Sequence, residues 1–163
     1  MDDIKDLVSL MTLLKKGNRE LKLTLSISSF VPKAQTPFQW EKRADIKILQ
    51  EKSDYLKKEL MKNNVAFKPT SLKWDFIQAI LSRGDRRLSH LLEKVYEYNG
   101  SLGSWGRSYK EIIQEDKYNI PNMEWYGLRE RAYDEILPWE FIYTGMDKNS
   151  LKNDRESSSK YKN

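Results

Sequence analysis

The spacing of hydrophobic residues along the chain is mostly helical. Apolar side chains recur every three or four residues in four long segments and two shorter ones, which predicts amphipathic helices that each bury one face. The expected helices cover residues 2–16, 42–63, 71–82, 86–98, 108–116 and 122–133. Asparagine, glycine and serine are frequent between segments 86–98 and 108–116, so residues 99–106 are expected to form a loop.

One segment, residues 21–31, departs from the helical spacing. Its apolar and polar residues alternate, which predicts a β-strand with one apolar face and one face of small polar side chains. A second, shorter strand is expected at residues 65–68, and Pro69 ends it. The expected fold class is therefore α+β and mostly helical.

The composition excludes several kinds of chemistry. The chain has 163 residues, no cysteine and a single histidine, His90. Disulfides, thiolate metal sites and cysteine nucleophiles are therefore excluded within this chain, as are metal sites that need several histidines. No apolar run is long enough to span a bilayer, and the first residues lack the apolar core of a signal peptide. A cytoplasmic location is expected.

The net charge of +5 is spread through the first half of the chain and its last residues. Such a distribution is typical of solvated helix surfaces, whereas a nucleic-acid-binding patch is more tightly clustered. One small cluster, Arg83, Arg86 and Arg87, could hold the phosphate or carboxylate of an anion or of RNA. The alternative is that these arginines form ion pairs with the acidic second half of the chain.

Three separated blocks resemble a known family. They are residues 26–40 (SISSFVPKAQTPFQW), residues 83–88 (RGDRRL) and residues 134–139 (DEILPW) followed by Gly145. In this order they are similar to the end of the barrel and the C-terminal region of radical S-adenosylmethionine (radical SAM) proteins, in the group with an N-terminal cobalamin (B12)-binding-type domain. Typical members read Pro-His where this chain has Ala34-Gln35. The resemblance covers roughly residues 1–150.

The resemblance implies a cofactor site. The related enzymes cleave S-adenosylmethionine with an electron from a [4Fe–4S] cluster and form a substrate radical, and the last barrel strand passes beside the bound cofactor. By match of motif, Ser28, Phe30 and Val31 are the expected cofactor-binding residues, nearest the adenosyl group. The alternative is that the small face of this strand only packs in a barrel interior.

The departures from the family are equally informative. The cysteine motif that holds the cluster is absent, and so are most barrel strands, so we expect a C-terminal fragment that binds no cofactor alone and is not catalytically competent alone. A gene fragment, a split gene and an independent protein remain open. Three regions are expected: 1–41, the end of the barrel; 42–146, a helical C-terminal module; and 147–163, a polar, disordered tail.

The expected partner is a separately encoded N-terminal radical SAM half. The kinship of the group with methylthiotransferases, together with the basic character of the chain, suggests an RNA substrate. The alternative function is a stand-alone accessory module that binds RNA or protein. An unpaired strand at 21–31 with an apolar face would also favour self-association.

Overall fold

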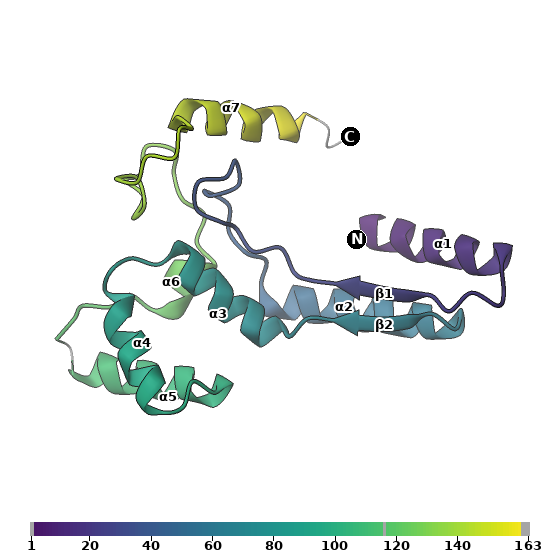
Figure 1. The fold of residues 1–163 in the computed structure, drawn as a ribbon, viewed down its shortest axis with the longest axis horizontal. Coiled ribbons are helices and arrows are strands. Elements are labelled where there is room, and N and C mark those ends of the chain that lie inside the picture. Colours follow the sequence, from purple (N-terminus) through teal and green to yellow (C-terminus); the bar gives the residue numbers. More distant parts are fainter. Residues whose placement is uncertain (1, 116, 161–163) are drawn as a thin grey trace. The chain divides into compact units, whose positions relative to one another are not determined.

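A computed structural model describes residues 2–115 and 117–160 and confirms the mostly helical α+β fold (Figure 1). Within these residues, no helix is both long enough and apolar enough to cross a lipid bilayer. Each of the expected long helices is present, and two short strands form the sheet.

The chain divides into two compact units. Unit 1 consists of Met1–Phe30 and Ala44–Asp75, and unit 2 consists of Val31–Arg43 and Phe76–Asn163. The division therefore differs from the three consecutive regions expected, with boundaries after residues 41 and 146. The proline-bounded loop that follows the first strand belongs to unit 2, while the next helix and strand return to unit 1.

Unit 1 is a helix followed by a β-α-β arrangement. Its elements are α1 (Asp2–Gly17), β1 (Thr24–Ile27), α2 (Ile46–Lys62) and β2 (Ala66–Pro69). The two strands are parallel, with Thr24 beside Ala66 and Ile27 beside Pro69. Parallel neighbours need a long crossover connection, and α2 lies within it. The strand expected at 21–31 is thus paired along one edge rather than isolated.

The first strand is shorter than the alternation predicts. Its partner strand ends at Pro69, which has no backbone N–H to donate to the ladder. The last ladder bond comes instead from the N–H of Thr70, which donates to the carbonyl of Ile27 at 3.0 Å. The ladder ends here, and the loops that follow the two strands line a cavity, described below.

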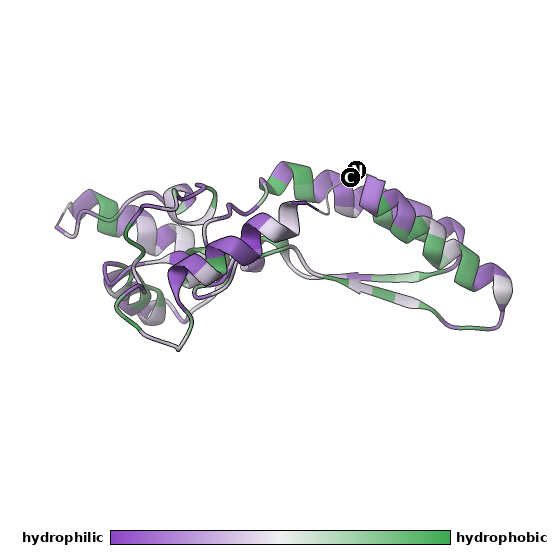
Figure 2. Ribbon diagram, turned by 90° about the horizontal axis from the view of Figure 1, so that it is seen from above, coloured by the Kyte–Doolittle hydropathy of each residue, from purple (hydrophilic) through white to green (hydrophobic). Residues whose placement is uncertain are grey.

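Both helices of unit 1 cover the same face of the sheet (Figure 2). Apolar side chains of the sheet pack against a core that α1 and α2 build around fully buried Leu60. The sheet contributes Leu23, Leu25, Ile27 and Phe67 to this core. The opposite face carries small exposed residues such as Thr24 and Ser26, in agreement with the alternation in the sequence.

Unit 2 is helical. Helix α3 (Leu72–Arg83) starts in unit 1 and ends in unit 2, and the remaining helices are α4 (Leu88–Glu97), α5 (Leu102–Glu115), α6 (Met123–Gly127) and α7 (Lys148–Ser159). The larger core of unit 2 lies between α3, α4, α5 and α6, around Ile80, Leu91 and Tyr126. A smaller core joins Trp40, Leu137, Trp139 and Leu151.

Helix α5 begins inside the segment that was expected to be a loop. The side chain of Ser101 accepts a hydrogen bond from the N–H of Ser104, as an N-terminal capping residue does. Trp105 and Ile112 then fall on one buried face. The glycines at 103 and 106 misled the prediction, because this packing outweighs their weak helix propensity.

Two further expectations at the C-terminal end differ from the structure. The helix expected at 122–133 ends at Gly127, and beyond it the N–H of Arg131 donates to the carbonyl of Trp40 at 2.8 Å. The tail expected to be disordered forms α7 over residues 148–159. Asp147 caps this helix, and Leu151 buries its side chain.

Replacing Leu60 by alanine tests the packing of unit 1. Leu60 is fully buried, so the lost contacts and the cavity left behind should lower the free energy of unfolding by about 3 kcal/mol. Urea unfolding followed by circular dichroism measures the change. Met61→Ala is the control, because the neighbouring side chain is 68% exposed. Equal effects of the two substitutions would contradict the assigned face of α2.

Candidate functional site

A cavity of about 280 Å³ lies at the carboxyl ends of β1 and β2, within unit 1. Its walls include Ser28 and Phe30, which follow β1, and Thr70, which follows β2. Lys52 and Leu56 of α2 complete one side. The carboxyl ends of parallel strands are where α/β sheets bind ligands, because the loops that follow the strands diverge there.

Asp75 connects the two loops that form the mouth of this cavity. Its Oδ2 accepts hydrogen bonds from Ser29 Oγ at 2.8 Å and from Thr70 Oγ1 at 2.6 Å. The backbone N–H of Ser29 donates to the same oxygen at 3.4 Å. Asp75 lies in the first turn of α3 and is 9% exposed, so a nearly buried carboxylate holds both loops in place.

Two of the three expected cofactor-binding residues line the same cavity. Ser28 and Phe30 contribute to its wall, whereas Val31 belongs to unit 2 and does not line it. Ser29 and Thr70 also line the cavity, although the motif did not single them out. The position of Thr70 directly after the second strand is the signal that could have identified it.

The side chains that line this cavity can hold a ligand with both apolar and polar groups. The residues that line it supply hydroxyl groups, apolar surfaces and the ammonium of Lys52, and none of them is a carboxylate or a histidine. Such a set can hold an apolar ring beside polar groups. In the part of the chain that the structure describes, there is no group of three or more residues able to hold a metal ion.

The expected anion-binding arginines lie in unit 2 but do not form one exposed cluster. Arg83 is fully buried and donates from Nη1 to the carbonyls of Tyr126 at 2.9 Å and Gly127 at 3.2 Å. Its Nη2 donates to the carbonyl of Arg129 at 2.6 Å. Burial, with the nearby charges of Arg131 and Arg129, lowers the pKa of Arg83 to about 10. Arg83 therefore organises the backbone at the end of α6 and just beyond it.

Arg87 has an internal partner as well. It forms an ion pair with Asp85, with Nη2 2.7 Å from Oδ2, and its Nη1 donates to the carbonyl of Asn119 at 2.7 Å. Burial raises the pKa of the Asp85 carboxyl, but hydrogen bonds from the side chain and backbone of Arg87 outweigh it, so the pKa is lowered overall. Arg86 alone among the three arginines is exposed.

Close packing around position 84, between Arg83 and Asp85, requires glycine there. A Cβ atom at Gly84 would lie 2.1 Å from Leu88 Cδ1 and 3.0 Å from the carbonyl oxygen of Ile80. The turn between α3 and α4 therefore has room only for glycine. The Arg-Gly-Asp sequence is explained by this packing and by the buried partners of its two charged residues.

Arg129 and Arg131 connect the third motif block, through Glu135, with the hydrogen bonds around Arg83. Arg129 donates to both oxygens of Glu135, at 2.7 and 2.6 Å. These hydrogen bonds lower the pKa of Glu135 despite its partial burial. Arg131, 3% exposed, donates from Nη2 to the carbonyl of Arg83 and so connects the second and third blocks.

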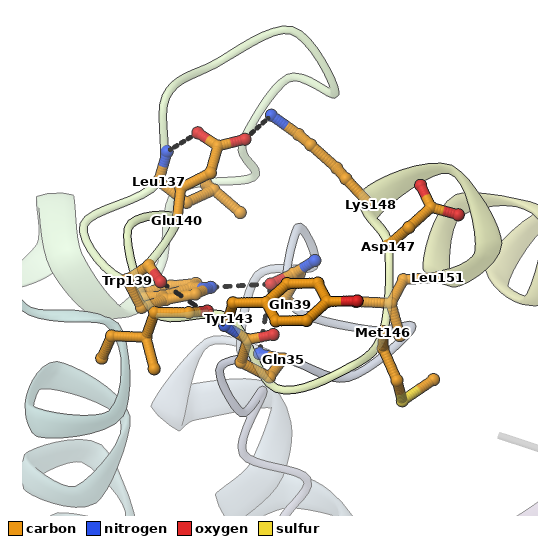
Figure 3. A pocket seen from close by; sticks show the side chains of 11 residues that line it. Gln35, Gln39, Leu137, Trp139, Glu140, Tyr143, Met146, Asp147, Lys148 and Leu151 are labelled. Atoms are coloured by element: carbon orange, nitrogen blue, oxygen red, sulfur yellow. Dashed lines mark hydrogen bonds and ion pairs between the residues drawn. The ribbon is translucent and has the colours of Figure 1, made fainter.

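The first block meets the third at a small pocket of about 180 Å³ (Figure 3). The indole Nε1 of Trp139 donates to Gln39 Oε1 at 2.7 Å, and both side chains are nearly buried. Gln35 Nε2 donates to the carbonyl of Ile142 at 2.7 Å. Glu140 forms an ion pair with Lys148 across the pocket. Gln35, at the position where the radical SAM group that the chain resembles has histidine, thus has a structural role here.

Comparisons with protein-family models, with curated proteins and with solved structures found no match to this chain.

Replacing Arg83 by lysine should destabilise unit 2. The single nitrogen of an ammonium cannot occupy the positions of both Nη1 and Nη2 of the planar guanidinium, so some of the three carbonyls lose their partner. We expect a loss of about 3 kcal/mol in the free energy of unfolding. Thermal or urea unfolding measures it, with exposed Arg86→Lys as the control. A loss below about 1 kcal/mol would mean that Arg83 is replaceable.

Glu135→Gln should change the pH dependence of stability. The pKa of Glu135 is lower in the folded chain than its usual value of 4.5, so its contribution is present above that pH and is lost as the pH falls through the lowered value. The stability difference between wild type and Glu135→Gln should therefore be largest near about pH 6 and shrink below about pH 4. Urea unfolding across this range, with exposed Glu130→Gln as the control, measures it. A difference that does not change with pH would refute the ion pair.

Proposed function

We propose that this chain is the C-terminal part of a radical SAM protein and supplies one wall of its S-adenosylmethionine site. The observation that carries this proposal is the cavity at the carboxyl ends of β1 and β2, lined by Ser28 and Phe30. These are residues that the family motif assigns to the cofactor. A ligand site at this edge is also what the geometry of parallel strands favours.

The cavity suits part of S-adenosylmethionine. The ring of Phe30 offers an apolar surface for an adenine ring, and the hydroxyls of Ser28 and Thr70 can bond to its polar groups. At about 280 Å³ the cavity is near the lower end of ligand-site sizes, roughly 300–1,000 Å³. A cavity of this volume fits the proposal that this chain forms only part of a larger ligand site.

The [4Fe–4S] cluster does not fit this chain. Cluster iron needs thiolate ligands, and the chain has no cysteine. In the family the cluster supplies the electron that cleaves S-adenosylmethionine. We therefore propose that this chain positions the adenosyl group and shields it from water, that another polypeptide holds the cluster, and that this chain alone is not catalytically competent.

The small sheet supports the need for a partner. Parallel sheets are normally covered on both faces and have more strands than the two described here. Helices α1 and α2 cover one face, and the other carries small exposed side chains. On α1, Leu10 and Leu13 are 51% and 68% exposed. We propose that an N-terminal radical SAM half adds strands to this sheet. Without it, the same surface would favour self-association.

The contacts between the motif blocks also support the resemblance. Residues that match the family at 36–40, 83–88 and 134–139 all lie in unit 2 and contact the same hydrogen-bonded network. Trp139 donates to Gln39, and Arg131 connects Arg83 with Glu135. Blocks that are far apart in the sequence thus stabilise one structural unit.

Titration with S-adenosylhomocysteine, a stable analogue of the cofactor, tests the proposal. In amide NMR spectra of the ¹⁵N-labelled chain, signals of Ser28, Ser29 and Thr70 should shift with a Kd of about 1 mM, because only one wall is present. Ser28→Trp should abolish the shifts by filling the cavity. Thr24→Trp, at the other end of the same exposed strand face, is the control and should retain them.

Two outcomes would refute this site. The first is no shift of these signals at about 5 mM ligand. The second is a set of shifts that Ser28→Trp leaves unchanged or that guanosine reproduces, since either would place the contact elsewhere or show that it does not depend on the adenosyl group.

A further inference from the structure

A groove in unit 2 is larger than the cavity described above and has a different character. We call it the arginine groove. It has a volume of about 810 Å³ and lies between the turn at Gly84–Arg86 and residues 135–142. Trp125, Arg131 and Trp139 are among the side chains that line it. Nothing in the proposed cofactor role uses this groove.

Large apolar side chains line the arginine groove without being buried. Ile136 and Phe141 are each 86% exposed, and Ile142 is 50% exposed. They belong to a short irregular segment that Trp139 anchors to the smaller core of unit 2. Neighbouring exposed apolar residues on a fixed segment are typical of an interaction surface.

The carboxylates that line the arginine groove are already neutralised. Asp85 pairs with Arg87, and Glu135 pairs with Arg129 at 2.6 Å. Glu140 pairs with Lys148. None of these three acidic side chains therefore leaves a full negative charge to repel an incoming anion.

Two arginines that line the groove have few internal partners for their guanidinium groups. Arg86 is exposed and forms no ion pair with any residue in the described parts of the chain. Arg131 is 3% exposed, yet its Nε and Nη1 have no hydrogen-bond partner, and the nearest carboxylate oxygen, on Glu135, is 3.8 Å from Nη1. A buried donor without a partner is unfavourable, so an acceptor from a ligand would be stabilising here.

The indoles of Trp125 and Trp139 hold the Arg131 guanidinium in place. Its central carbon lies 5.7 Å from the ring centre of Trp125 and 5.2 Å from that of Trp139. Tryptophan and arginine are the residue types that dominate binding energy at protein interfaces. The groove thus combines fixed aromatic anchors, exposed apolar side chains, the exposed cation of Arg86 and the buried cation of Arg131.

We infer that the arginine groove binds a short segment of a partner protein that carries an apolar or aromatic side chain next to a carboxylate. The apolar side chain packs against Phe141 and Ile136, and the carboxylate pairs with exposed Arg86, with the buried positive charge of Arg131 in the wall of the groove adding to the attraction. A protein segment is favoured over RNA because the groove is mainly apolar and offers few cations to track a phosphate backbone. This inference does not depend on the cofactor site.

Selection from a phage-displayed library of random twelve-residue peptides tests the inference with the purified chain as the target. The enriched peptides should combine a large apolar residue with an aspartate or glutamate. Fluorescence anisotropy with the best synthetic peptide then gives its affinity. Arg86→Ala and Phe141→Ala should each weaken binding by about tenfold or more.

The controls match each variant in exposure. Arg19→Ala removes an exposed arginine of unit 1, and Tyr96→Ala removes an aromatic side chain that is 85% exposed on α4, outside the groove. Both should leave the affinity unchanged. Because all four positions are exposed, loss of folding does not confuse the comparison.

Three results would overturn the inference. One is a library that yields no enriched peptide or only peptides without an acidic residue. Another is a selected peptide that binds Arg86→Ala and Phe141→Ala as tightly as the unsubstituted chain. The third is a labelled single-stranded RNA twelve-mer that binds the chain more tightly than the peptide and loses affinity in the same two variants.

Discussion

The buried guanidinium of Arg83 is the interaction on which unit 2 depends. It donates to three backbone carbonyls at the end of α6 and just after it, where no following helical turn supplies N–H donors. Its own carbonyl accepts from Arg131, which approaches Glu135 of the third motif block. An irregular segment thus holds a fixed path because one planar cation serves several acceptors at once.

In unit 1 a carboxylate, that of Asp75, fixes irregular segments in a similar way. Asp75 gathers donors from the loops after both strands, and the cavity at the sheet edge lies between those loops. A helix and a β-α-β arrangement place the loops side by side, and the carboxylate fixes them there. The cofactor proposal depends on this arrangement, since a site for part of a ligand is useful only if its shape is already formed.

The sequence predicted the regular elements well, because apolar spacing directly reflects a buried face. The family resemblance singled out Ser28 and Phe30, which both line one cavity, and their cofactor role stays a prediction. The sequence did not predict contacts between residues that lie far apart along the chain. It suggested either an anion contact or an ion pair for Arg83, whereas its partners are backbone carbonyls more than 40 positions away, which no local pattern identifies. Helix α7 was missed because its burial rests largely on a single side chain, Leu151.

Iron–sulfide reconstitution of the purified chain tests the central claim most directly. After anaerobic reconstitution, the chain is incubated with dithionite and S-adenosylmethionine and analysed by electron paramagnetic resonance and for 5′-deoxyadenosine. The account predicts neither a [4Fe–4S] signal nor 5′-deoxyadenosine, because the chain has no cysteine to hold the cluster. A cluster signal together with 5′-deoxyadenosine from this chain alone would contradict it.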